Sequence, residues 1–338
     1  MKKTSLVDIA RALNISPTTV SFILNNKAEE KRISKKLVKI VLDYVEEVGY
    51  RPNPLARSLR TGKTNTIGLM VEDIANPFFG HIARKIEEEA YKNGYKILYC
   101  STDNNTEKTK DLITMFRERQ VDGYIISPPP RVEKEIESLI QSNIPVVLFD
   151  RTLVGLDVDS VLIDNFSSTY KATIHLLENY RNIAFITLNS TQTQMIHRLS
   201  GYLKAMEENK LKPLIKEISF NLPNKDIQDQ IESFLNENPS LDGIIFSTNY
   251  LGISGLKAIH SLNRETPLQL GIVAFDNHDL FKLHSPAITA ISQPITEIAN
   301  KVIKLLMKKL NGANQQETQQ IILDTKLEIR SSSLKQKK

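Results

Sequence analysis

SLVDIARALNISPTTVSFILNN, residues 5–26, is the stretch of sequence that decides the fold of the N-terminal part of this chain. Ser5 lies three residues before an aspartate, which is the spacing of a capping box at the start of a helix. Asn14 tolerates the left-handed backbone that ends a helix, and Ser16 followed by Pro17 is a second N-cap with proline in the first turn. The stretch therefore predicts two short helices joined by a tight turn, a helix-turn-helix.

A third helix is predicted between Ser34 and Gly49, where apolar residues recur with helical spacing: Leu37, Val38, Val41, Leu42 and Val45. A three-helix bundle need not bind nucleic acid, and the charge distinguishes the two cases. Residues 1–63 contain 13 Lys and Arg against 6 Asp and Glu, whereas the whole chain contains 44 against 39. The positive charge is thus confined to the N-terminal part, as expected for a surface that contacts DNA phosphates. We therefore predict a DNA-binding headpiece at residues 1–50.

Residues 51–64 combine features of a linker and of a very short helix. Pro52 ends the third helix, and Asn53 is placed to cap a new helix of one to two turns. A helix of that length is marginal in water, so it needs a partner to order it. An ordinary linker is the alternative, but Arg57 and Arg60 favour DNA as that partner.

Residues 65–330 alternate between β-rich runs and runs with helical periodicity. Strands are predicted at 67–72, 95–101, 123–127, 146–150, 160–164, 183–188, 215–220, 243–247 and 270–275, and helices at 78–93, 106–120, 132–142, 166–179, 193–209, 225–237 and 250–262. Such alternation implies parallel sheets covered by helices. Because there are about twice as many units as one doubly wound sheet needs, we predict two α/β lobes.

Residues 5–26, together with PNPLARSLRTGK at 52–63, resemble the headpiece and hinge helix of the LacI/GalR family of bacterial transcription regulators. The resemblance continues more diffusely to about residue 330. It implies a homodimer on palindromic operator double-stranded DNA, with paired hinge helices in the minor groove. It also implies that Leu59 is an apolar wedge that kinks the central base step.

The family reads bases with the first two residues of its second helix and with an arginine after a Val-Ser pair, and this chain departs from that pattern. The matching positions hold Pro17, Thr18 and Phe22. Proline donates no hydrogen bond, and phenylalanine cannot make the bidentate contact of arginine to guanine. Phe22 therefore either touches a thymine methyl or packs inside the headpiece. The residues expected to contact DNA are Ser5, Ser16, Pro17, Thr18, Thr19, Ser21, Phe22 and Asn25 in the headpiece, and Asn53, Leu55, Ala56, Arg57, Leu59 and Arg60 in the hinge.

The resemblance further implies a fold class: a small all-α helix-turn-helix headpiece plus a two-lobed α/β core like that of type I periplasmic binding proteins. Crossovers near 163–165 and 291–294 would divide the core at 65–330 into lobe one, about 65–163 and 294–330, and lobe two, about 164–293. A helix at 295–310 and a strand near 319–329 would return the chain to lobe one. We expect residues 331–338 to form a disordered basic tail without a leucine heptad, which favours a dimer over a tetramer.

Ligands of open α/β sheets bind beyond the carboxyl ends of the strands, and acids, amides, an arginine and aromatic residues stand there in this chain. Such a set suits a polyol, because bidentate hydrogen bonds hold vicinal hydroxyls and a ring face covers the C–H side. The resemblance assigns effector contacts to Asp150, Arg198, Asn249, Asp276 and Gln293, and pocket-lining roles to Phe78 or Phe79. An aspartate that ends a strand is also a common helix cap. The complete set of expected effector-binding residues is Asn76, Phe78, Phe79, Asp150, Arg198, Phe246, Asn249, Asp276 and Gln293.

The class of effector stays open between a sugar and a sugar acid. The chain has no Trp, so Phe79, Phe220, Phe246 or Tyr250 would have to stack on a sugar ring. The cationic side chain of Arg198 would also tolerate a uronate or the carbonyl of a purine. The effector is expected to be the only small molecule bound, with no cofactor and no metal.

Motifs of enzymes are missing from the sequence. It contains no glycine-rich phosphate loop, no nucleophile elbow and no histidine spacing typical of a metal site. The single cysteine, Cys100, ends a β-rich run and is interpreted as a core thiol. With no apolar run of membrane-spanning length and no signal peptide, a cytoplasmic protein is expected.

These features together predict a sequence-specific DNA-binding transcription regulator whose operator affinity depends on a small molecule. Repression is favoured, and the sequence leaves activation open as the alternative. The alternative is an α/β enzyme or a sugar-binding module that carries a DNA-binding tail. Sugar binding without turnover, combined with salt-sensitive operator binding, distinguishes the two.

Overall fold

The computed structural model describes residues 4–50, 62–220, 222–262, 270–312 and 318–335. The chain divides into two compact units, Met1–Thr64 and Asn65–Lys338. No helix in these ranges is both long enough and apolar enough to cross a membrane.

The first unit contains the three predicted helices, α1 (Leu6–Ala12), α2 (Pro17–Leu24) and α3 (Lys35–Glu47). The Ser5 hydroxyl accepts from the Asp8 amide at 3.2 Å, and the Asp8 carboxylate accepts from the Ser5 amide at 2.9 Å. The Ser16 hydroxyl accepts from the Thr19 amide at 3.0 Å. Asn14 has a φ of +53°. The capping box, the second N-cap and the left-handed turn are therefore confirmed.

A small apolar core holds the three helices together. Ile9, Val20 and Val41 are fully buried, one from each helix. Leu42, expected on the same face, is 45% exposed. It follows Val41 by one residue, which rotates it about 100° around the helix axis and away from this core.

Lobe one of the second unit has a six-stranded sheet in the order β11-β5-β4-β3-β1-β2. Every strand pair in it is parallel. The strands are β1 (Thr66–Val71), β2 (Lys96–Ser101), β3 (Gly123–Ile126), β4 (Val146–Phe149), β5 (Asp159–Ile163) and β11 (Gln320–Leu323). Its helices are α5 (Pro77–Lys92), α6 (Thr106–Glu118), α7 (Glu133–Gln141) and α13 (Ile295–Leu310).

Lobe two repeats this plan, with the sheet order β12-β10-β9-β8-β6-β7. Its strands are β6 (Ile183–Leu188), β7 (Leu214–Ile218), β8 (Gly243–Phe246), β9 (Gly271–Phe275), β10 (Thr289–Ser292) and β12 (Lys326–Glu328), of which β12 is antiparallel to β10. Its helices are α8 (Asn165–Leu177), α9 (Thr193–Glu208), α10 (Asn224–Glu237), α11 (Asn249–Ser261) and α12 (Asp279–Leu283). Two parallel α/β lobes are therefore confirmed.

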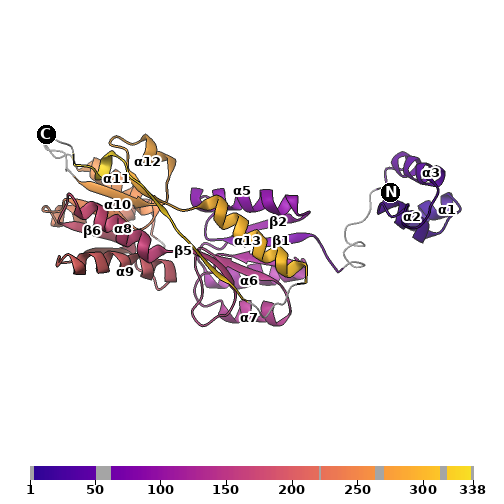
Figure 1. The fold of residues 1–338 in the computed structure, drawn as a ribbon, viewed down its shortest axis with the longest axis horizontal. Coiled ribbons are helices and arrows are strands. Elements are labelled where there is room, and N and C mark those ends of the chain that lie inside the picture. The colour runs from indigo at the N-terminus through magenta and orange to yellow at the C-terminus, as the bar shows by residue number, and fades with distance from the viewer. Residues whose placement is uncertain (1–3, 51–61, 221, 263–269, 313–317, 336–338) are drawn as a thin grey trace. The chain divides into compact units, whose positions relative to one another are not determined.

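Central strands of both sheets are buried on both faces, which explains their nearly continuous apolar sequence. In lobe one, Ile125 and Val147 pack on the side of α5 and α13, whereas Ile126 and Leu148 pack on the side of α6 and α7. α5 and α13 lie side by side over their face of the sheet (Figure 1).

The C-terminal strand region differs from the single strand expected near 319–329. β11 pairs with β5 in lobe one, and β12 pairs with β10 in lobe two, so the chain crosses between the lobes a third time (yellow in Figure 1). The polar pair Asp324 and Thr325 interrupts the strand, and the Thr325 hydroxyl lies 2.6 Å from that of Ser168.

Ser331–Ser333 forms a short 3₁₀ helix, so the predicted disordered tail is wrong for residues 331–335. The Ser332 hydroxyl donates to the Ile272 carbonyl at 2.6 Å and accepts from the Thr289 amide at 2.8 Å. Ser333 is also buried, with its hydroxyl 2.8 Å from Nε2 of His175. Hydroxyl groups here satisfy backbone groups at the amino ends of β9 and β10, a role that no apolar pattern signals.

Candidate functional site

The carboxyl ends of the strands of both lobes face a shared narrow cavity of about 30 Å³. In each sheet the first strand, β1 or β6, has neighbours on both sides that follow it in sequence, which is the switch point where open α/β sheets bind ligands. Seven of the nine expected effector residues line this cavity: Asn76, Phe78, Phe79, Asp150, Arg198, Asp276 and Gln293.

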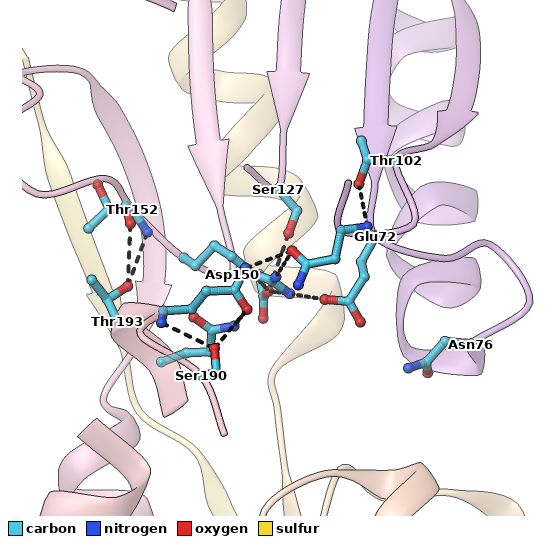
Figure 2. A network of polar contacts seen from close by, with 12 residues as sticks. Glu72, Asn76, Thr102, Ser127, Asp150, Thr152, Ser190 and Thr193 are labelled. Atoms are coloured by element: carbon cyan, nitrogen blue, oxygen red, sulfur yellow. Dashed lines mark hydrogen bonds and ion pairs between the residues drawn. The ribbon is translucent and has the colours of Figure 1, made fainter. Parts of the chain in front are cut away.

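On the lobe-one side, Arg151 lies between two buried carboxylates. Its Nη2 is 2.7 Å from Oε2 of Glu72 and 2.8 Å from Oδ2 of Asp150, and its Nε donates to that same Asp150 oxygen at 2.8 Å. Burial alone would lower the pKa of Arg151, but the charges of Asp150 and Glu72 outweigh it and raise the pKa. Figure 2 shows Glu72, Ser127 and Asp150 gathered at the ends of their strands. This side of the cavity thus holds a compact, charge-compensated cluster.

On the lobe-two side, Arg198 is held in place by hydrogen bonds to other residues of its own lobe. Its Nε donates to Oδ1 of Asn165 at 2.8 Å, and its Nη1 donates to the Ser247 carbonyl at 2.7 Å. Its guanidinium carbon lies 3.5 Å from the centroid of the Phe275 ring. Burial lowers the pKa of Arg198, and the nearby charge of Asp276 opposes that shift. Arg198 is therefore a fixed, dehydrated cation facing the cavity.

Asp276 is the electrostatic counterpart of Arg198 in lobe two. Its Oδ1 accepts from Nε2 of Gln293 at 2.7 Å. Burial raises the pKa of Asp276, while the charge of Arg198 and the hydrogen bond from Gln293 lower it to a smaller extent. A ligand that offers hydroxyl groups to both side chains would relieve the cost of their burial.

Polar contacts join the two lobes across the cavity. Nδ2 of Asn249 donates to Oδ1 of Asn76 at 2.8 Å, and Nε2 of Gln192 donates to Oδ1 of Asn104 at 2.7 Å. Asn249 lines a neighbouring groove rather than this cavity. The expected effector contact of Asn249 therefore corresponds in this structure to a contact between the lobes.

Phe246 does not lie at the cavity, in contrast to the prediction. It is fully buried in the core of lobe two, against α11. A Cβ atom at Gly255 would come within 2.2 Å of its ring. Because β8 is buried on both faces, the sequence did not reveal to which side Phe246 points. Of the other aromatic candidates, Phe79 and Tyr250 line the cavity, and Phe220 packs against the core of lobe two.

Several polar cavity residues were not among those expected from the sequence: Glu72, Gln192, Gln194 and Thr248. Glu72 follows an apolar strand directly, and that charge at the end of a buried strand is the signal that could have identified it. Gln194 is buried, and its Oε1 has no hydrogen-bond partner within the described ranges.

In the headpiece, seven of the eight residues expected to contact DNA lie between Ser16 and Asn25, along α2 and its two caps. Ser16, Pro17 and Thr18 are exposed there. Phe22 is half-buried with the Lys31 ammonium 5.5 Å from its ring centroid, so it lies at the margin of the bundle rather than in the fully buried core.

The other headpiece candidates have local hydrogen bonds. Nδ2 of Asn25 donates to the Ser21 carbonyl at 2.6 Å, and the hydroxyls of Thr19 and Ser16 lie 2.8 Å apart. Ser5 is exposed but occupied in its capping box. The hinge candidates Asn53, Leu55, Ala56, Arg57, Leu59 and Arg60 lie outside the described residues.

A helix-turn-helix unit followed by a two-lobed α/β core with a polar cavity between the lobes defines a ligand-responsive DNA-binding regulator. Residues 5–53 match the family described as bacterial regulatory proteins, lacI family, and residues 175–333 match a periplasmic binding protein-like domain. The chain belongs to the lacI family of bacterial regulatory proteins, whose members are transcription regulators.

Relatives and solved structures support this assignment over nearly the whole chain. A ribose operon repressor of Halalkalibacterium halodurans is 31% identical over 331 residues, which cover 98% of this chain and 97% of the relative. A periplasmic binding protein/LacI transcriptional regulator from Alkaliphilus metalliredigens, solved with D-xylulofuranose, is 28% identical with a TM-score of 0.70 and covers 80% of this chain and 100% of that structure. A LacI family regulator from Enterococcus faecium, solved with ribose, is 26% identical with a TM-score of 0.71 and also covers 80% and 100%.

Proposed function

We propose that this chain is a homodimeric repressor that releases its operator when a small carbohydrate binds between the two lobes. The observation that carries the proposal is the cavity, in which carboxylates, guanidinium groups and side-chain amides converge beside the ring pair of Phe78 and Phe79. This combination holds hydroxyl groups by hydrogen bonds and covers the C–H face of a sugar ring. The names of the ribose operon repressor and of the two sugar-bound structures support a carbohydrate.

The effector acts as an allosteric ligand and not as a substrate or cofactor, and the protein acts in the cytoplasm, where its operator is found. Headpieces of the two protomers bind the two halves of a palindrome, with the exposed start of α2 toward the major groove. Effector binding changes how the lobes sit in each protomer, and hence the spacing of the two hinge segments. Since a short helix is marginal alone, that change releases the DNA.

Operator binding measured by fluorescence anisotropy tests this proposal. The labelled fragment is the DNA upstream of the gene for this chain, titrated at several salt concentrations with and without D-ribose, D-xylulose or D-galactose. We expect a steep salt dependence and weaker operator binding in the presence of one of these sugars. Because coupling is reciprocal, operator DNA must weaken sugar binding by the same factor. Equal sugar affinity with and without operator, or consumption of the sugar, would contradict the proposal.

A further inference from the structure

The cavity contains two arginines in opposite electrostatic situations, and this difference bears on which ligands can enter. Arg151 contacts Glu72 and Asp150 directly. Its remaining nitrogen, Nη1, donates to Oδ1 of Asn104 at 3.3 Å. Every nitrogen of this guanidinium group therefore has an acceptor from the protein, and four of its five N–H groups are directed at Glu72, Asp150 and Asn104 rather than at a ligand.

Arg198 has no such direct counter-ion in the described part of the chain. Asp276 lies close enough to oppose the lowering of its pKa, yet the two side chains form no ion pair within 4.0 Å among the described residues. A group that accepts from the guanidinium and donates to the carboxylate would interact favourably with both side chains. A hydroxyl group does both, whereas a carboxylate can only accept.

The unpartnered oxygen of Gln194 points to the same chemistry. Its Oε1 is buried at the cavity wall without a partner among the described residues, and a buried acceptor of this kind needs a donor. A ligand O–H or N–H group, or an ordered water that such a ligand replaces, can supply that donor. An ionised carboxylate or phosphate oxygen beside it would be repelled.

The charges that line the cavity also disfavour an anionic ligand. Three carboxylates, those of Glu72, Asp150 and Asp276, face two guanidinium groups, so the cavity has no surplus of positive charge. An anion entering this dehydrated space would add a further negative charge to three carboxylates, and among the described lining residues only Arg198 is a guanidinium group not already in direct contact with a carboxylate. An excess of buried charge of one sign is strongly disfavoured. Glu72 is decisive, because without its charge the surroundings of Arg151 become more positive by one unit.

We infer that the effector is an uncharged polyol, and that Glu72 is the specificity-determining residue that excludes sugar acids and sugar phosphates by neutralising Arg151. This inference rests on the proposed function, since it names the class of ligand for the same cavity. Discrimination arises here from an interaction that the wrong ligand lacks, rather than from tighter contacts to the right one.

Matched ligand pairs test the inference on the full-length protein. D-galactose with D-galacturonate, D-glucose with D-glucuronate, and D-ribose with D-ribose 5-phosphate differ mainly by one ionised group. Affinities are measured by isothermal titration calorimetry, and melting temperatures are recorded for each ligand. For the wild type we expect a neutral member to bind at least about tenfold more tightly than its charged counterpart.

Variants then assign the effect to Glu72. Glu72→Gln keeps the shape and the acceptor oxygen toward Arg151 but removes the charge, and should bring the affinity for the charged member at least about tenfold closer to that for the neutral one. The double variant Glu72→Gln with Arg151→Gln restores the charge balance and should return the wild-type preference. Glu88→Gln is the matched control, because Glu88 is a carboxylate of the same lobe that lies away from the cavity and pairs with Lys85.

Each outcome decides between the two claims. A wild type that binds galacturonate or ribose 5-phosphate as tightly as the neutral sugar overturns the inference and leaves the sugar-controlled repressor intact, whether or not the variants fold. An unchanged preference in folded Glu72→Gln removes Glu72 from the role of selecting ligands. If no sugar of either kind binds or alters operator affinity, the proposed function fails and this inference fails with it.

Discussion

Lobe one and lobe two place an aspartate at the same point of the same fold, yet give it opposite surroundings. Asp150 follows β4 and Asp276 follows β9, strands that occupy equivalent places in the two sheets. Asp150 contacts an arginine of its own lobe directly, whereas Asp276 contacts Gln293 and faces Arg198 without direct pairing in the described structure. The difference indicates that lobe one forms a preorganised wall, and that lobe two carries the polar groups left for a ligand.

The two aspartates share the same unusual backbone conformation, although their surroundings differ. Asp150 has a φ of +67° and Asp276 a φ of +66°, in the left-handed region that is unfavourable for most residues other than glycine. Such a conformation costs about 1–3 kcal/mol and persists where surrounding structure enforces it, often at functional sites. Both lobes therefore accept the same local strain to hold an aspartate at the cavity.

Removing Arg151 should produce the largest effect, because it breaks the wall of lobe one. Arg151→Ala leaves Glu72 and Asp150 buried without their guanidinium partner, and we expect the free energy of unfolding to fall by about 3–5 kcal/mol in urea denaturation at pH 7. Arg84→Ala is the control, since Arg84 forms exposed ion pairs on α5 and should cost less than about 1 kcal/mol. A similar small loss for both variants would show that the cluster does not stabilise lobe one.

Removing Arg198 should weaken effector binding rather than disrupt the Arg151 cluster of lobe one. Arg198→Ala is expected to weaken effector binding about a hundredfold, which corresponds to about 2.7 kcal/mol, and to abolish the operator response. Operator affinity in the absence of effector should stay within about twofold of the wild type, as measured by anisotropy. Lys204→Ala on the same helix is the control, because Lys204 is exposed and paired with Glu207. Normal induction of Arg198→Ala by the sugar would place the effector elsewhere.

The smallest effects should differ in sign between the two aspartates. Burial raises the pKa of Asp276, so the ionised form is disfavoured in the folded state, and Asp276→Asn should stabilise the free protein at pH 7 by on the order of 1 kcal/mol. This gain should disappear below the unfolded-state pKa of 3.8, where Asp276 is protonated in both states, and should grow as the pH rises through the folded-state pKa.

Asp150→Asn should instead destabilise the protein at pH 7 by a similar amount, because it removes one of the two carboxylates in contact with Arg151. Thermal denaturation of both variants between pH 3 and pH 8 measures the contrast. Equal effects of the two substitutions would contradict the distinction between the lobes.

Local signals in the sequence were sufficient for the headpiece and for the alternation of the core. The capping box of Ser5 and the left-handed turn at Asn14 depend on residues within three or four positions, which the sequence displays directly. Seven of the expected effector residues reach the cavity because parallel strands bring their carboxyl ends to one edge.

Signals that depend on distant partners were not readable from the sequence. The side chain of Phe246 points into the core because both faces of β8 are buried, so an apolar residue there fits either side. The split between β11 and β12 and the anchoring of Ser332 depend on strands far away in the chain. Glu72 was overlooked because its partner Arg151 follows a different strand.

β11 also has a consequence for how the chain reaches this fold. Just before β11, the amide of Gln319 donates to the carboxylate of Asp159 in β5, 160 residues away, and Lys309 pairs with that carboxylate at 3.1 Å. All of lobe two except β12 and the 3₁₀ helix lies between those two positions in the chain. Since closing a long loop costs conformational entropy, the pairing becomes accessible once lobe two has compacted the intervening chain. We therefore expect refolding to complete the central strands of both sheets first and to add the β11 edge of lobe one last.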